Sequence, residues 1–246
     1  VVIDDGIADP YGNTIPRGRT VRFQTGALQP TYQLRTPDFV GTYDASLPAQ
    51  LVVGHVNLER LSLRLYQLPI QALTQDPWEW QDRDRTLPRE SLLREWQATL
   101  AAPLNQQEHT IINLKEQPGD SLSPGLYLLD VEAPELRRDE WRRTQRHMLV
   151  VSELNLTLKS GPEDLMIWAV DLGTGDPVSD LALTVRDIYD RRQQTTRTDA
   201  EGIAQLSLAE DFRNIIALSE EPFAAVSSNW GRGIGPWRSE ERRVGK

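Results

Sequence analysis

The chain has 246 residues, with 27 Lys and Arg, 36 Asp and Glu, no Cys and a formal net charge of −9. This acidic balance argues against a nucleic-acid-binding protein, which needs a basic face to neutralise phosphates. The lack of cysteine excludes disulfide frameworks and thiolate metal sites. No apolar run reaches the length of about 18 residues that indicates a membrane-spanning helix, so we expect no membrane-spanning segment.

The first 26 residues contain two strand-like segments separated by a turn. Val1–Ile3 is apolar, and Val21, Phe23 and Thr25 alternate with polar residues, which is typical of a half-buried strand. The cluster Asp9–Asn13 between them has the composition of a turn. Because two strands cannot enclose a core, we expect residues 1–26 to be the C-terminal strands of a truncated Ig-like domain.

Residues 27–151 contain several short apolar or alternating runs that predict a second domain with a β-sandwich fold. The pattern breaks between Pro69 and Pro88, where a helical turn at 70–73 and a loop or short helix at 76–80 are expected. Residues 88–96 fit a helical start or the approach to a strand. We therefore predict a loop or short-helix insertion near 69–91. The expected strands are Leu51–Val53, Leu61–Leu65, Thr110–Leu114, Leu126–Val131 and Arg146–Val151.

Residues 152–230 show about seven strand-like runs separated by turns, which predicts one further small sandwich. Leu154, Leu156 and Leu158 alternate with polar residues, and similar runs follow as far as Val226. We expect Trp96 and Trp168 to lie in the core of their sandwiches. Residues 231–246 are polar and basic without a pattern, so we expect a linker and a tail that is not native to the protein.

Together these segments predict an all-β chain of tandem small β-sandwiches, of the Ig-like, macroglobulin-like or fibronectin-III-like kind. Short alternating strands, bounded by Gly, Pro, Asn and Asp, are the pattern from which such folds are predicted. We found little sustained helical periodicity. The N-terminus begins without Met, a basic segment or an apolar segment, so we expect a fragment of a larger modular protein.

Two turn motifs in the third segment resemble those of macroglobulin-type domains in the bacterial α2-macroglobulin family. The first motif is Asp171–Val178, where Gly and Pro fix the backbone dihedrals of the turn. The second is Thr198–Gly202, a hairpin end at which Gly202 can adopt a positive φ. The residues that carry this resemblance are structural: Asp171, Thr174, Gly175, Pro177, Thr198, Asp199 and Gly202.

Three other segments extend the resemblance over residues 1–237. Pro124–Val131 resembles the beginning of a strand in the preceding module of such proteins. Asp9–Asn13, closing with Phe23–Thr25, resembles the end of a bacterial Ig-like domain often found upstream. Ser228–Trp237 resembles the linker that follows the last module. The order of these modules is more specific than any one motif.

The resemblance implies a structural scaffold within a broad-spectrum endopeptidase inhibitor. In that family a protease cuts a bait segment, the β-domains rearrange and the protease is entrapped; in many members a Cys–Gln thioester then acylates it. This sequence has no Cys and no recognisable bait segment. The resemblance therefore implies no enzymatic activity and no cofactor. The implied partners are neighbouring domains and target proteases, and the implied location is periplasmic, cell-surface or extracellular in a bacterium.

The main alternative is a set of Ig-like modules from a cell-surface adhesin or glycan-binding protein. Trp78 and Trp80 would then form an exposed platform on which a sugar ring stacks. The same two residues could instead anchor the insertion to the sandwich, and we favour this second interpretation. Titration of tryptophan fluorescence with polysaccharides separates the adhesin hypothesis from the inhibitor hypothesis.

Other site chemistries have weaker support. Asp171, Asp176, Asp180 and Asp199 suit a calcium site in type but not in spacing, and Asp is common in turns. The carboxylates within residues 79–90 lie in a polar loop, and no Gly-x-Ser-x-Gly motif surrounds any serine. Arginines within residues 137–146 are interrupted by acidic residues, which suggests a solvated loop or a docking patch for a neighbouring domain. We therefore predict no catalytic, cofactor-binding or metal-binding residue.

Overall fold

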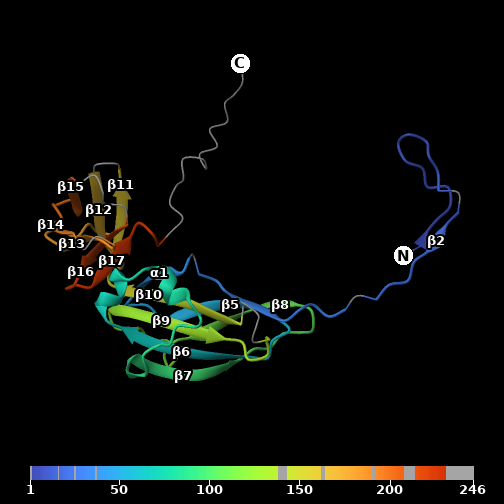
Figure 1. Ribbon diagram of the computed structural model, residues 1–246, viewed down its shortest axis with the longest axis horizontal. Helices are drawn as coiled ribbons and strands as arrows, with labels where there is room; N and C mark the ends of the chain where they lie inside the picture. Colours follow the sequence, from blue (N-terminus) through green and yellow to red (C-terminus); the bar gives the residue numbers. More distant parts are fainter. Residues whose placement is uncertain are drawn as a thin grey trace, which may run out of the picture.

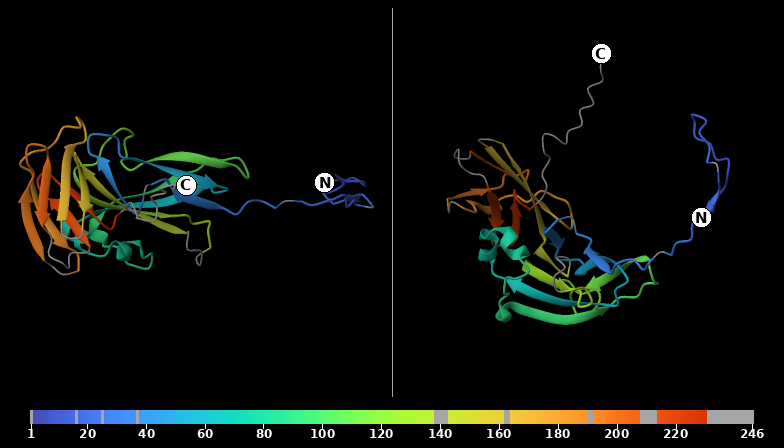
Figure 2. Two further views of the ribbon diagram at one scale, coloured as in Figure 1. Left: turned by 90° about the horizontal axis from the view of Figure 1, so that it is seen from above. Right: turned by 45° about the vertical axis from the view of Figure 1, so that its right-hand side comes forward.

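The computed structural model describes residues 2–15, 17–24, 26–36, 38–137, 143–161, 164–189, 192–207 and 214–230. These residues form an N-terminal hairpin and two β-sandwiches that lie against one another (Figures 1 and 2). The arrangement confirms the predicted all-β fold of tandem small sandwiches. None of the helices in the described ranges is long and apolar enough to cross a membrane.

The N-terminal hairpin consists of β1 (Val2–Ile3) and β2 (Arg19–Thr20), which pair antiparallel. In Figure 1 it lies apart from the sandwiches, at the end of an extended stretch of chain. The strand predicted over 21–25 is wrong for its described part, because 21–24 are not in a strand. Val21 and Phe23 are 41% and 69% exposed, so these two apolar side chains do not pack into a core. Thr25 lies outside the described residues.

The first sandwich packs a five-stranded sheet on a three-stranded sheet. The five-stranded sheet has the order β4-β10-β9-β6-β7, in which β4 and β10 are parallel and the other pairs antiparallel. Its strands are β4 (Val40–Asp44), β6 (Arg60–Leu68), β7 (Leu92–Thr99), β9 (Gly125–Glu132) and β10 (Thr144–Ser152). The other sheet has the order β3-β5-β8, all antiparallel: β3 (Thr31–Leu34), β5 (Gln50–Val56) and β8 (Gln107–Asn113).

The insertion between β6 and β7 contains three short helices. They are η1 (Ile70–Thr74), α1 (Pro77–Gln81) and η2 (Arg89–Ser91). The predicted helical turn at 70–73 is therefore present, and the segment at 76–80 is a short helix rather than a loop. Residues 88–96, for which both a helical start and the approach to a strand were predicted, begin with one 3₁₀ turn and continue as β7.

The central strands β9 and β10 of the five-stranded sheet are buried on both faces, which explains their unbroken apolar runs. Leu129 and Leu149 face the three-stranded sheet and belong to the core between the two sheets. Leu128 and Val150 face the opposite way, into a second apolar cluster. All four side chains are at most 1% exposed. A strand covered on both faces needs no polar residue in alternation.

The second sandwich contains seven strands among its described residues, arranged as two sheets. The three-stranded sheet has the order β11-β12-β15: β11 (Leu154–Ser160), β12 (Asp164–Asp171) and β15 (Ile203–Ser207). The four-stranded sheet has the order β14-β13-β16-β17: β13 (Ala182–Asp187), β14 (Gln193–Arg197), β16 (Ile215–Ser219) and β17 (Ala224–Ser227). Residues such as Leu165, Ile167 and Leu183 fill the core between these sheets.

The tryptophan expected in this core is not there. Trp168 is 43% exposed, on the outer face of β12. Side chains alternate along a strand, so burial of Ile167 and Ala169 places Trp168 outward. Trp96, the other predicted core tryptophan, is half-buried and packs against the core of the first sandwich.

Only Glu153 separates the last strand of the first sandwich from the first strand of the second. The predicted domain limits at 26, 151 and 230 remain predictions. Residues 231–246, expected to be a linker and tail, lie outside the described residues.

Candidate functional site

A continuous apolar cluster joins the two sandwiches and the insertion. From the first sandwich and the insertion it contains eleven buried residues: Val40, Tyr66, Leu68, Ala72, Leu73, Trp80, Leu87, Leu126, Leu128, Met148 and Val150. From the second sandwich it contains Ile216 and Leu218 of β16, Ala225 of β17, and Phe223, which directly precedes β17. We call this set the junction cluster. Because these side chains are at most 9% exposed, the two sandwiches share a core here.

Two polar contacts cross the same junction. The Ser152 hydroxyl, at the end of β10, donates to the carbonyl of Phe223 at 2.6 Å and accepts from the Leu154 N–H at 2.8 Å. Ser152 is fully buried. The Tyr189 hydroxyl donates to the Asp76 carboxylate at 2.6 Å, and this hydrogen bond raises the pKa of Tyr189. The first contact ties the end of β10 to the residue that precedes β17, and the second ties the insertion to the second sandwich.

Arg146 of β10 holds the insertion on the sheet. Its Nε donates to the buried Asp130 carboxylate at 2.8 Å, and the side chain of Arg146 is only 5% exposed. The two terminal nitrogens donate to backbone carbonyls of the insertion, those of Trp80, Asp82, Arg83 and Arg85. A guanidinium with its donors satisfied in this way fixes a loop that has little regular structure of its own.

The solvated loop expected for the arginine-rich stretch is therefore wrong for two of its members. Arg146 is buried, and Arg143 is held by the Glu132 carboxylate at 2.6 and 2.8 Å. Arg138 and Arg142 lie outside the described residues. The sequence showed the arginines, but it did not show that their acidic partners, Asp130 and Glu132, lie opposite them on the antiparallel strand β9.

Trp80 is an anchor of the insertion. It is 4% exposed, belongs to the junction cluster, and the Arg85 guanidinium carbon lies 3.9 Å from its ring centroid. Its ring therefore presents no open face on which a sugar could stack. Trp78 lies in α1, and its side chain is outside the described residues. The exposed platform of the adhesin hypothesis is thus absent at Trp80.

The first turn motif is organised by its own side chains. The Asp171 carboxylate accepts from the N–H groups of Gly173 at 2.9 Å and Thr174 at 2.8 Å. Thr174 in turn accepts from the Asp176 N–H at 3.1 Å. Gly175 has a φ of +76°, a conformation that side chains rarely adopt. Pro177 follows and forms a bridge with Val170.

The second turn motif packs directly against the first. The Thr198 hydroxyl donates to the carbonyl of Val178 at 2.6 Å and accepts from the Leu181 N–H at 2.9 Å. The Asp199 carboxylate accepts from the Ile203 N–H at 2.8 Å. Gly202 has a φ of +73°, and a Cβ on it would lie 2.5 Å from the carbonyl oxygen of Ala169 and 3.0 Å from the Pro177 Cβ. The sequence motifs are thus a single structural unit.

Three of the four aspartates considered for a calcium site have partners that account for them. Asp171 and Asp199 accept backbone N–H groups, and the exposed Asp180 pairs with Arg197 at 2.9 Å. In the described ranges no three His, Cys, Asp or Glu residues gather closely enough to hold a metal ion.

Two of the three histidines are buried between the sheets of the first sandwich. The His147 Nε2 lies 2.6 Å from the Tyr43 hydroxyl, and burial lowers the pKa of His147 from 6.5 to about 4. The His55 Nε2 lies 2.9 Å from the Thr110 hydroxyl, and burial lowers its pKa as well. Both rings are therefore neutral near pH 7, and each contacts a hydroxyl group.

No protein-family model and no curated protein matches this sequence. Among solved structures, the Escherichia coli α2-macroglobulin fragment spanning domains MG0-NIE-MG1 is similar over 92% of this chain and 73% of its own, with 16% identity and a TM-score of 0.63. The chain has the fold of bacterial α2-macroglobulin domains. At this level of identity the likeness concerns the fold alone.

Two further α2-macroglobulin structures support the same conclusion. The E. coli fragment spanning NIE-MG1 is covered over 97% of its length by 81% of this chain, with 14% identity and a TM-score of 0.58. A Salmonella α2-macroglobulin variant matches 92% of this chain with 14% identity and a TM-score of 0.60. This chain spans only 14% of that Salmonella chain. The resemblance inferred from the turn motifs is thus confirmed for the fold.

Proposed function

We propose that this chain is a structural scaffold of a bacterial α2-macroglobulin-like protease inhibitor. The observation that carries the proposal is the likeness of fold to an α2-macroglobulin fragment over 92% of the chain. The proposed location, by analogy with such inhibitors, is periplasmic, cell-surface or extracellular. The proposed partners are further domains of the inhibitor and the target protease.

The junction cluster supports a scaffold role. Both sandwiches contribute buried side chains to it, and the insertion contributes Trp80, whose backbone carbonyl is bonded to Arg146 of β10. A scaffold must hold its domains in fixed relative positions until a protease acts, and a shared apolar core does this more firmly than a polar domain interface.

We propose further that the chain has no catalytic activity of its own. Each buried histidine contacts a neutral hydroxyl, that of Tyr43 or Thr110, rather than a serine beside a carboxylate. The Arg85–Glu79 ion pair is a contact within the insertion. This arrangement suits support rather than chemistry.

The proposal is tested on the full-length product of the gene that encodes this chain. The purified product is incubated with trypsin, and the remaining activity is assayed on a large protein and on a small chromogenic peptide. We expect loss of proteolysis of the large protein with retention of peptide hydrolysis, because an entrapped protease still admits small molecules. Undiminished proteolysis of the large protein would overturn the proposal. The 246-residue chain alone is the control and leaves both activities unchanged.

A further inference from the structure

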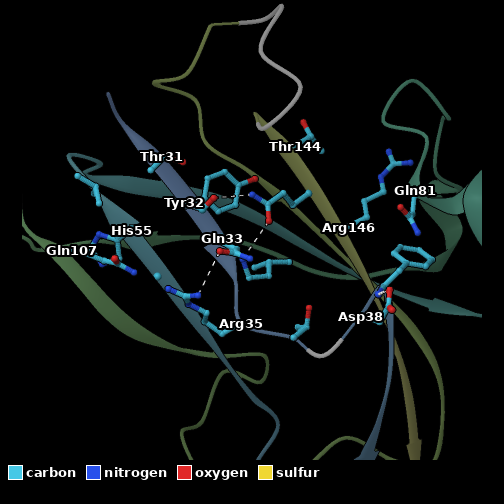
Figure 3. A pocket seen from close by; sticks show the side chains of 16 residues that line it. Thr31, Tyr32, Gln33, Arg35, Asp38, His55, Gln81, Gln107, Thr144 and Arg146 are labelled. Atoms are coloured by element: carbon cyan, nitrogen blue, oxygen red, sulfur yellow. Dashed lines mark hydrogen bonds between the residues drawn. The ribbon is translucent and has the colours of Figure 1, made fainter. Parts of the chain in front are cut away.

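An open groove of about 820 Å³ lies beside β3 in the first sandwich. Figure 3 shows β3, with Tyr32 and Gln33, diverging from the first residues of β10, with Thr144 and Arg146. Gln81, at the end of α1, lies on the far side of the groove from His55. No step of the proposed scaffold role uses this groove.

One long edge of the groove is the backbone of β3. This strand pairs with β5 on its other side, where for example the Arg35 N–H donates to the Val52 carbonyl at 2.9 Å. On the groove side β3 pairs with no strand of the described sheets. The Tyr32 carbonyl and the Leu34 N–H point to this side, since both bond to the Gln145 side chain of β10. An unpaired strand edge of this kind is a template for another strand.

The Gln145 carboxamide occupies the place of a strand residue. Its Nε2 donates to the Tyr32 carbonyl at 2.9 Å, and its Oε1 accepts from the Leu34 N–H at 3.2 Å. One residue of a parallel strand placed opposite Gln33 would make the same two bonds, one from its N–H and one to its carbonyl. The molecule therefore already holds an amide group at this edge, in the geometry of a peptide.

The other groups along the groove favour an uncharged ligand that forms hydrogen bonds. Arg35 and Asp38 carry opposite charges, and Arg146 is paired with Asp130. The remaining polar side chains are mainly amides and hydroxyls: Gln33, Gln81, Gln107, Thr31, Thr36 and Thr144. An anionic ligand would need an excess of cationic side chains, which this lining does not supply.

One further observation favours a peptide over a sugar. Tyr32 is 2% exposed, and Phe39 is half-buried and packs against the junction cluster. Neither aromatic side chain of the lining therefore forms an open platform on which a sugar ring stacks.

We propose that this groove binds an extended, uncharged polypeptide segment of a partner protein, which adds to β3 as a parallel strand and displaces the Gln145 carboxamide. This mode of binding is strand addition at a sheet edge, in which main-chain hydrogen bonds provide the affinity. Gln145 competes with the incoming strand and keeps the edge closed until a segment of suitable sequence arrives. The inference does not depend on the scaffold proposal, because it rests on the edge of β3 alone.

The probe for this proposal is a fluorescein-labelled octapeptide of alternating Thr and Gln, blocked at both ends and titrated by fluorescence anisotropy. We expect saturable binding to the 246-residue chain and about tenfold tighter binding to Gln145→Ala, since the competing pair of hydrogen bonds is removed. Gln205→Ala changes an exposed glutamine of the second sandwich and serves as the matched control, with unchanged affinity. In Gln145→Ala the probe should also slow hydrogen exchange of the Leu34 N–H.

Three results would overturn the proposal. They are no saturable binding to either protein, equal affinity of wild type and Gln145→Ala, and binding of maltohexaose in place of the peptide. A thermal melt checks that Gln145→Ala is folded. If it is not, Gln145→Thr replaces it, because threonine lacks the carboxamide and favours a strand; the same gain in affinity is then required.

Discussion

The central strands of the five-stranded sheet in the first sandwich and the three-stranded sheet of the second differ in how many of their faces are covered. Strands β9 and β10 are buried on both sides, by the partner sheet and by the junction cluster. The three-stranded sheet of the second sandwich exposes Trp168 on its outer face. The difference is visible in the sequence: β9 contains an unbroken apolar run, whereas apolar and polar residues alternate strictly in β11. An unbroken run thus marks the strand through which two domains share a core.

The largest effect should come from the arginine that seals the shared core. We expect Arg146→Ala to lower the free energy of unfolding by about 4 kcal/mol, because it leaves the Asp130 carboxylate buried without its closest partner. Urea unfolding followed by tryptophan fluorescence measures this loss. The matched control is Arg197→Ala in the second sandwich, whose ion pair is exposed and should contribute less than about 1 kcal/mol. Equal losses for the two variants would contradict the role of Arg146.

The next effect concerns the paired turns of the second sandwich. Gly202→Val should cost about 3 kcal/mol, since it combines a positive φ with contact between the new Cβ and the Ala169 carbonyl. The control Gly26→Val has open space around it and should change stability by less than about 0.5 kcal/mol. Thermal melts of both variants measure the difference, and an unchanged midpoint for Gly202→Val would refute the turn assignment.

Covered and open faces can also be compared directly. Ile216→Ala removes a side chain of the junction cluster and should cost about 2–3 kcal/mol. Trp168→Ala removes a larger side chain from an open face and should cost less than about 1 kcal/mol. Urea midpoints give both values. A larger loss of stability for Trp168→Ala than for Ile216→Ala would mean that the outer face of the three-stranded sheet is covered in solution.

The smallest effect is a dependence of stability on pH. Burial lowers the pKa of His147 from 6.5 to about 4, while the nearby Asp38 opposes this shift. The ring stays neutral in the folded state but takes up a proton in the unfolded state below pH 6.5. The contribution of His147 to the free energy of unfolding is therefore at its maximum above pH 6.5. It decreases as the pH drops towards 4, and at pH 5 it is about 2 kcal/mol lower than at neutral pH.

Unfolding curves between pH 7 and 4.5 check this dependence. His147→Gln should flatten the decrease, whereas His109→Gln, which changes an exposed histidine, should keep it. An equal slope in both variants would show that another group is responsible.

Much of the fold could be predicted from local pattern. Alternation found β6, β11 and β15, and the turn residues located Gly202 and its neighbours. It did not find β3, β4 or β14, because Tyr-Gln-Leu, Val-Gly-Thr and Gln-Gln-Thr-Thr runs are too short or too polar to show a period. These strands are defined by pairing with distant strands.

The junction was the least predictable part of the candidate site. Nothing local to Arg146 indicates that its partners are Asp130 and four carbonyls of the insertion. The burial of Trp80 similarly depends on strands from both sandwiches. The alternation at Val21 and Phe23 predicted a strand that the structure does not have. A periodic segment becomes a strand only when another strand is available to pair with it.

The single residue between β10 and β11 also limits how the molecule can move. Glu153 is flanked by Ser152, which is bonded to the Phe223 carbonyl, and by Leu154, which is buried. With so short a link, and a core shared across it, the two sandwiches have little freedom to change their relative orientation. In the extended stretch between β2 and β3 the described residues form no strand (Figure 1). We therefore expect the N-terminal hairpin to change its orientation relative to the sandwiches more readily than the sandwiches change theirs relative to one another.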